Sequence, residues 1–143
     1  MNNNAENLYR FIDAQEDVYH KVIQELRNGK KETHWMWFIF PQIAGLGYSS
    51  TAKYYALQNV DEARAYLAHP TVGARLLECT EIVLAHKGIS ALTIFGNIDE
   101  MKLRSSMTLF THVAGPDSLF QQALDMHFDG EQDHRTLDIL AKL

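Results

Sequence analysis

Apolar residues recur with the 3.6-residue period of an α-helix along almost the whole chain, and this pattern constrains the fold more than any other feature. No segment alternates cleanly between apolar and polar residues, as a half-buried β-strand would. Glycine, proline, serine and asparagine separate the periodic stretches, where they end one helix or cap the next. The pattern therefore predicts an all-α fold, a compact bundle of about eight helices. We expect these helices over residues 6–28, 50–58, 61–68, 70–87, 90–96, 97–114 and 117–130, and from residue 133 onward.

Residues 33–41 form an aromatic stretch that is apolar on every side. Such a run is either a short buried helix or a buried strand, and its length does not decide between them. Thr33 at its start and Pro41 at its end favour the helix, because threonine caps helices and proline ends them. In either case we expect the stretch to be mostly interior.

The length of 143 residues and the hydrophobic share of 46% are typical of one globular domain with its own core. We expect residues 1–5 to form a disordered tail and residues 6–143 to form that domain. The net charge of −5 argues against nucleic acid and against an anionic membrane surface as partners. A single cysteine, no apolar targeting segment and no apolar run long enough to span a bilayer predict a soluble, cytoplasmic protein.

Seven histidines raise the question of a metal site, but none of them forms a pair with the spacing of metal ligands. Asp129, Asp133 and His134 lie close together in the sequence without the spacing of a calcium-binding loop. The sequence therefore predicts neither a metal site nor a cofactor.

One face of the helix predicted over residues 97–114 carries Asp99, Lys102 and Ser105, with Ser106 beside them. A lysine next to a hydroxyl can activate it as a nucleophile, and Asp99 would orient or activate the group. We take Asp99, Lys102 and Ser105 as the candidate catalytic residues, although serine–lysine enzymes of the penicillin-binding class have the reverse order. The alternative is a structural ion pair between Asp99 and Lys102 on a solvated face.

A glycine loop leads into the helix that Ser49 or Ser50 caps, and its backbone N–H groups are suited to hold an anion. The loop has neither the lysine of a phosphate-binding P-loop nor a third glycine in the dinucleotide-binding spacing. Aromatic residues nearby can stack a base, and an arginine fork suits a phosphate or carboxylate. The candidate ligand-binding residues are His34, Trp35, Gln42, Gly45, Gly47, Ser50 and Arg75.

Several segments occur together in a specific combination: KK at 30–31, HWMWFIFPQ at 34–42, GLG at 45–47, DEAR at 61–64, YLAHP at 66–70, Gly73, RL at 75–76 and KLRSSMTLF at 102–110. With them the chain resembles, from about Leu8 to Leu140, the bacterial family called domain of unknown function 1810. The resemblance implies a compact multihelical fold and no established activity. Members of the family are sometimes labelled calpastatin, but a protease-inhibitor repeat would be disordered and poor in aromatic residues.

The order of Phe40-Pro41, a Ser50-to-Tyr55 helix and a Pro70-to-Arg75 turn is similar to that in proteins that process ADP-ribose-linked riboflavin intermediates. We expect a small-molecule enzyme or binding protein whose polar pocket takes an anionic, nucleotide-like or NAD- or ADP-ribose-derived ligand. The alternative is a non-enzymatic helical interaction module whose polar cluster is structural. A pocket open to solvent favours the first, and polar side chains fully paired with one another favour the second.

Overall fold

The computed structural model describes residues 8–143 and confirms the all-α fold. The predicted tail over residues 1–5 and the predicted helix start at Glu6 lie outside the described residues. Within residues 8–143 there are nine helices and no strand. The helices are α2 (Tyr9–Glu16), α3 (Tyr19–Arg27), α4 (Met36–Ile39), α5 (Ser50–Tyr55), α6 (Val60–Ala68), α7 (Val72–Ala85), α8 (Ala91–Ala114), α9 (Leu119–Phe128) and α10 (His134–Ala141).

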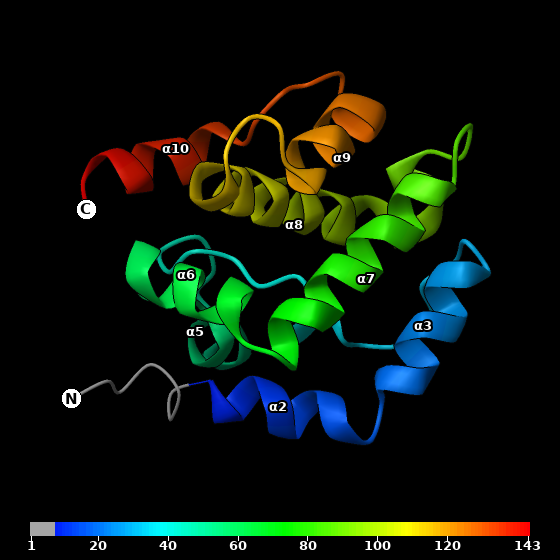
Figure 1. The fold of residues 1–143 in the computed structure, drawn as a ribbon, viewed down its shortest axis with the longest axis horizontal. Coiled ribbons are helices and arrows are strands. Elements are labelled where there is room, and N and C mark those ends of the chain that lie inside the picture. Colours follow the sequence, from blue (N-terminus) through cyan, green and yellow to red (C-terminus); the bar gives the residue numbers. More distant parts are fainter. Residues whose placement is uncertain (1–7) are drawn as a thin grey trace.

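The longest helix, α8, lies at the centre of the packing (Figure 1). Helices α6, α9 and α10 pack against it. Helix α7 contacts both α9 and α3. The buried side chains form one contiguous cluster that extends from Leu8 before α2 to Leu140 in α10. The compact bundle predicted from the periodicity is therefore confirmed.

Short polar side chains begin five of the described helices. In each case the side-chain oxygen accepts a hydrogen bond from the backbone N–H three residues later, a group that has no partner inside the helix. The starts predicted at Asp117 and near Asp61 move by one or two residues, because the neighbouring serine and asparagine take the extended backbone of a cap. The capping residues are Ser49, Asn59, Ser90, Ser118 and Asp133.

The continuous helix predicted over residues 6–28 is wrong, because a turn at Asp17 and Val18 separates α2 from α3. There the backbone N–H of Val18 donates to the carbonyl of Gln15 in a tight turn (3.1 Å). By contrast, the boundary predicted at Gly96 is confirmed within α8. Gly96 has φ 83° and ψ 167°, so that the helix consists of two pieces joined at this glycine.

The aromatic stretch contains α4, a single turn of helix, which confirms the helical interpretation. Trp35 and Phe40 on either side of the turn are at most 1% exposed, while Trp37 and Phe38 within it are half-buried. The stretch then runs into a loop whose two ends are tied together. The backbone N–H of Ala44 donates to the carbonyl of Leu57 (2.8 Å), and the N–H of Leu57 donates to the carbonyl of Gln42 (2.9 Å).

This tie closes residues 42–58 into a compact segment that carries the glycine loop and α5 and that faces α8. It is the part of the fold that forms one wall of the candidate site. Among the described residues, no helix combines the length and the apolar character needed to cross a membrane.

Candidate functional site

A pocket of about 470 Å³ lies between the 42–58 segment, α8 and the start of α10, and we call it the α8–α10 pocket. Trp37 from α4 and Ile98 and Met101 from α8 contribute apolar surface to it. Its volume falls within the range of pockets that hold small organic ligands. The charged and amide-bearing residues that line it, together with one buried serine, are Gln42, Lys53, Gln58, Lys102, Ser105, Asp133 and Arg135.

Cations dominate the charge of the α8–α10 pocket. Lys53, Lys102 and Arg135 line it against a single carboxylate, Asp133. That carboxylate is engaged at the start of α10, where its Oδ2 accepts hydrogen bonds from the backbone N–H (2.9 Å) and the hydroxyl (2.6 Å) of Thr136. The pocket thus carries net positive charge in a chain whose total charge is −5. Such a local concentration of positive charge attracts anions.

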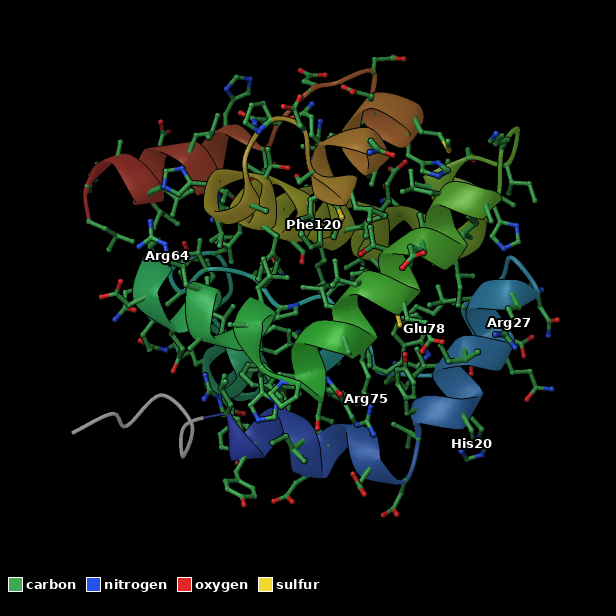
Figure 2. The ribbon with its side chains drawn as sticks, in the orientation of Figure 1. His20, Arg27, Arg64, Arg75, Glu78 and Phe120 are labelled. Carbon is green, nitrogen blue, oxygen red and sulfur yellow. The ribbon has the colours of Figure 1, made fainter. Side chains whose placement is uncertain are left out.

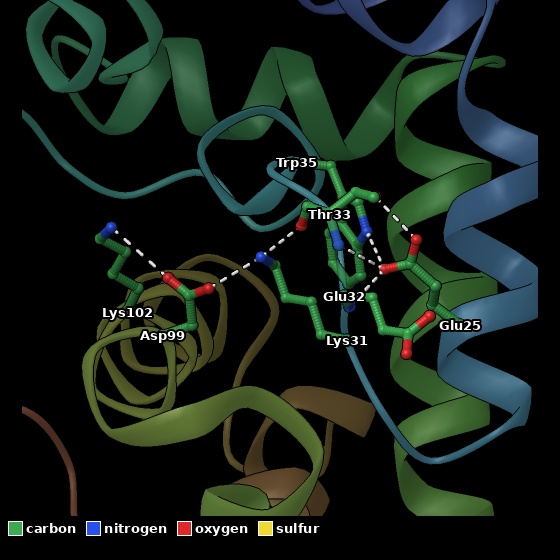
Figure 3. Close-up of polar contacts among 7 residues, drawn as sticks. All are labelled: Glu25, Lys31, Glu32, Thr33, Trp35, Asp99 and Lys102. Carbon is green, nitrogen blue, oxygen red and sulfur yellow. Dashed lines mark hydrogen bonds and ion pairs between the residues drawn. The ribbon is translucent and has the colours of Figure 1, made fainter.

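Lys102 is held at the edge of the pocket by two neighbours. Its ammonium nitrogen lies 4.3 Å from the ring centre of Trp37 and 3.5 Å from Oδ1 of Asp99. The other carboxylate oxygen of Asp99 pairs with Lys31 at 2.9 Å (Figure 3). Asp99 itself does not line the pocket. Asp99 therefore contacts Lys102 from outside the pocket lining, and it links α8 to the 30–33 segment.

Hydroxyl groups join α8 to the first turn of α10. The Ser105 hydroxyl lies 3.0 Å from the hydroxyl of Thr136, which in turn bonds to Asp133. One turn further along α8, Thr108 donates to a carbonyl of its own helix and accepts from the backbone N–H of Asp133 (2.8 Å). These bonds fix the start of α10, and with it the end of the pocket, against α8.

The structure brings five of the predicted site residues to this one pocket, which are Gln42, Gly45, Gly47, Lys102 and Ser105. Ser50, in contrast, is the first residue of α5 and is exposed outside the pocket lining. His34 is exposed as well and does not reach the pocket. Trp35 is fully buried and donates its ring N–H to Glu25 (2.9 Å), which leaves it no surface for stacking a ligand.

Arg75 lies elsewhere, on the side of α7 that faces α2 and α3 (Figure 2). Its guanidinium donates to the side-chain oxygen of Gln15 (3.2 Å) and lies over the ring of Tyr19, 4.7 Å from the ring centre. Gln15 in turn donates to the hydroxyl of Tyr66 (3.2 Å). Arg75 therefore belongs to a polar network between helices, and the arginine that lines the pocket is Arg135.

Sequence reasoning did not single out Lys53, Arg135 or Asp133 as pocket residues. Arg135 donates to the backbone carbonyl of Leu46 (3.2 Å) and so joins α10 to the glycine loop, 89 positions away in the sequence. A local pattern gives no signal for such a contact, because it depends on how α10 packs against α8. The aspartate did carry a signal as a helix-start residue, but capping alone does not indicate a pocket.

Glu25 in α3 organises the polar contacts around the aromatic stretch, and sequence reasoning missed it as well. One carboxylate oxygen accepts from the backbone N–H groups of Glu32 (2.7 Å) and Thr33 (3.0 Å) and from the ring N–H of Trp35, and the other accepts from the Thr33 hydroxyl (2.7 Å; Figure 3). Burial alone would raise the pKa of Glu25, but these four hydrogen bonds outweigh it and lower the pKa to about 2. Glu25 is thus a charged anchor for the 32–35 segment.

Outside the α8–α10 pocket, the described residues contain neither a metal-ligand cluster nor an activated thiol. No group of three histidine, cysteine, aspartate or glutamate side chains in residues 8–143 is arranged to hold a metal ion. Burial raises the pKa of the Cys79 thiol to about 12, so the thiol stays protonated and unreactive at neutral pH.

Comparison with known proteins identifies the family. The model of a family described as protein of unknown function, DUF1810, matches residues 5–140, so the chain belongs to that family. The fold is similar to the crystal structure of the conserved hypothetical protein Rv1873 from Mycobacterium tuberculosis, with a TM-score of 0.92 and 46% sequence identity over 94% of this chain and 96% of that one. No curated protein matches the sequence. The family resemblance found in the sequence is confirmed. No ligand or reaction is stated for the family or for Rv1873.

Proposed function

We propose that this protein binds an anionic small molecule of nucleotide size in the α8–α10 pocket. The observation that carries the proposal is the gathering of Lys53, Lys102 and Arg135 around a pocket of about 470 Å³ in a chain of net charge −5. Positive charges gathered in one place attract negative charge, so an anionic ligand that neutralises them is stabilised there.

In this proposal Lys102 and Arg135 hold the anionic group of the ligand, and Asp99 orients Lys102. Arg135 offers a planar fork of donors that matches a phosphate or a carboxylate. The apolar surface of Ile98 and Met101, which are 70% and 56% exposed, supplies a place for the uncharged part of the molecule. A nucleotide or an ADP-ribose derivative combines these two kinds of group.

The second candidate function is a non-enzymatic interaction module, and the paired state of Asp99 favours it. Asp99 bridges Lys31 and Lys102, with 18% of its side chain exposed, as expected of a link between elements. Under this alternative the pocket binds no ligand. Asp99→Asn would then only destabilise or unfold the protein. Under the proposed function, the same variant stays folded and changes anion affinity.

The test is calorimetric titration of the protein with adenosine 5′-monophosphate (AMP), with ADP-ribose and with uncharged adenosine. We expect the two anions to bind and adenosine to bind at least about tenfold more weakly, since a charge-assisted hydrogen bond contributes roughly 1.5–3 kcal/mol. Lys102→Met and Arg135→Met should each weaken AMP binding by about tenfold or more for the same reason.

Lys87→Met is the matched control, because it removes the same charge from an exposed residue that does not line the pocket. Its AMP affinity should equal that of the wild-type protein. If AMP and ADP-ribose bind no better than adenosine, or if Lys87→Met weakens binding as much as Lys102→Met, the proposed function is wrong. Melting temperatures of the unliganded variants would show whether any loss reflects unfolding.

A further inference from the structure

The hydrogen-bond chain that ends at Asp133 fixes the direction in which the Ser105 hydroxyl donates. Asp133 as a carboxylate has only acceptor atoms, and its Oδ2 lies 2.6 Å from the Thr136 hydroxyl. The proton of Thr136 therefore points to Asp133. A hydroxyl has a single proton, so Thr136 can only accept in its contact with Ser105 (3.0 Å).

Ser105 must then donate its own proton to Thr136. Ser105 lines the α8–α10 pocket although the residue is only 3% exposed. Because its proton is donated to Thr136, the Ser105 oxygen has only lone pairs to offer to a ligand. A buried acceptor that faces a ligand without a donor loses a hydrogen bond with water and gains none in return.

We infer that Ser105 is a specificity-determining residue that accepts a hydrogen bond from the ligand, and that the ligand carries a hydroxyl group close to its anionic group. This inference rests on the proposed function. The hydroxyl must lie close to the anion because Ser105 stands one turn from Lys102 on α8, and its partner Thr136 is adjacent to Arg135. A ribose phosphate has this arrangement, whereas a simple anion such as sulfate has no donor to offer.

Because Ser105 donates its proton to Thr136, Ser105 and the pocket cations have different roles in ligand binding. Ser105 cannot donate to the anionic group, so binding of negative charge falls to the cations of the pocket. The cations therefore govern affinity for any anion, and Ser105 governs the choice between hydroxylated and non-hydroxylated anions.

The experiment compares AMP with 2′,3′-dideoxyadenosine 5′-monophosphate, which keeps the base and the phosphate and lacks both ribose hydroxyls. Titration calorimetry with the wild-type protein should show about tenfold tighter binding of AMP, the size expected for one well-formed hydrogen bond to a buried acceptor. Ser105→Ala should bind both compounds with nearly the affinity that the wild-type protein has for the dideoxy compound.

Ser106→Ala is the matched control, since Ser106 is the next residue of the same helix, is fully buried, has no hydrogen-bond partner among the described residues and does not line the pocket. It should retain the full preference for AMP. Equal binding of the two compounds by the wild-type protein, or a preference that survives in Ser105→Ala, would overturn the inference and leave the proposed function intact. If neither compound binds, the proposed function fails and this inference fails with it.

Discussion

At the scale of single residues, Glu25 makes a testable contribution to stability. Its pKa of about 2 lies below the ordinary value of 4.5, so the ionised carboxylate stabilises the folded state at every pH above about 4.5. That stabilisation is lost as the pH falls from about 4.5 towards about 2. Glu25→Gln keeps the shape of the side chain and removes its charge. We expect the wild-type protein to be more stable than Glu25→Gln at pH 7 by roughly 2–3 kcal/mol, measured by urea unfolding.

This difference should shrink towards zero as the pH falls below about 2, because the wild-type carboxyl is then mostly protonated as well. Glu32→Gln is the control, since Glu32 is the neighbouring exposed acid whose backbone, and not its side chain, contacts Glu25. Its stability should follow that of the wild-type protein at every pH. A Glu25→Gln variant whose deficit is the same at pH 7 and pH 3 would show that the carboxylate charge is not what anchors the 32–35 segment.

Among the site residues that sequence reasoning placed correctly, Lys102 and Ser105 are related by local geometry. Lys102 and Ser105 share a helix face because they are three residues apart, and both line the pocket. Arg75 and Arg135 show where such reasoning ends. Nothing local distinguishes these two arginines, and only the packing of α7 beside α3 and of α10 beside α8 decides which of them lines the α8–α10 pocket.

At the scale of elements, Gly73 permits the close approach of α6 and α7. A Cβ atom at this position would lie 2.1 Å from the backbone carbonyl oxygen of Leu67 and 2.9 Å from that of Tyr66. Backbone atoms cannot swing away as a flexible side chain can. We expect Gly73→Ala to destabilise the protein by about 2 kcal/mol or more in urea unfolding, as overpacking of a tight contact does.

The direction of the stability change in Gly73→Ala distinguishes a steric effect from an effect of helix propensity. Helix propensity alone predicts the opposite result, because alanine stabilises a helix interior by roughly 1 kcal/mol relative to glycine. Ala74→Gly, at the next and exposed position of α7, serves as the control and should cost only that propensity difference. If Gly73→Ala proved as stable as the wild-type protein, the helices would not be held as closely as the structure indicates.

Element boundaries were predictable where a residue marks them chemically. Ser90 and Asp133 cap helices through contacts with the next few residues, and Gly96 takes a positive φ, so all three act locally. The break at Asp17 and Val18 had no such marker. Phe11 before the break and Val22 after it both face the core, so the apolar stripe continues across a turn that only tertiary packing reveals.

At the scale of the whole molecule, the continuity of the core predicts how the chain unfolds. The buried cluster includes side chains from α2, near one end of the chain, and from α10, near the other, and it is not divided into two separate cores. Helix α8 contacts elements from both halves of the sequence. We therefore expect residues 8–143 to behave as a single domain that unfolds in one cooperative step.

The measurement is urea unfolding followed in parallel by tryptophan fluorescence and by far-ultraviolet circular dichroism. Trp35 and Trp37 report on the packing between α4 and its neighbours, whereas circular dichroism reports on all the helices together. For a single domain the two midpoints coincide, and saturating AMP moves both by the same amount because it binds only the folded pocket. Two separate midpoints, or an AMP shift confined to one signal, would mean that the helices around the α8–α10 pocket unfold as a unit of their own.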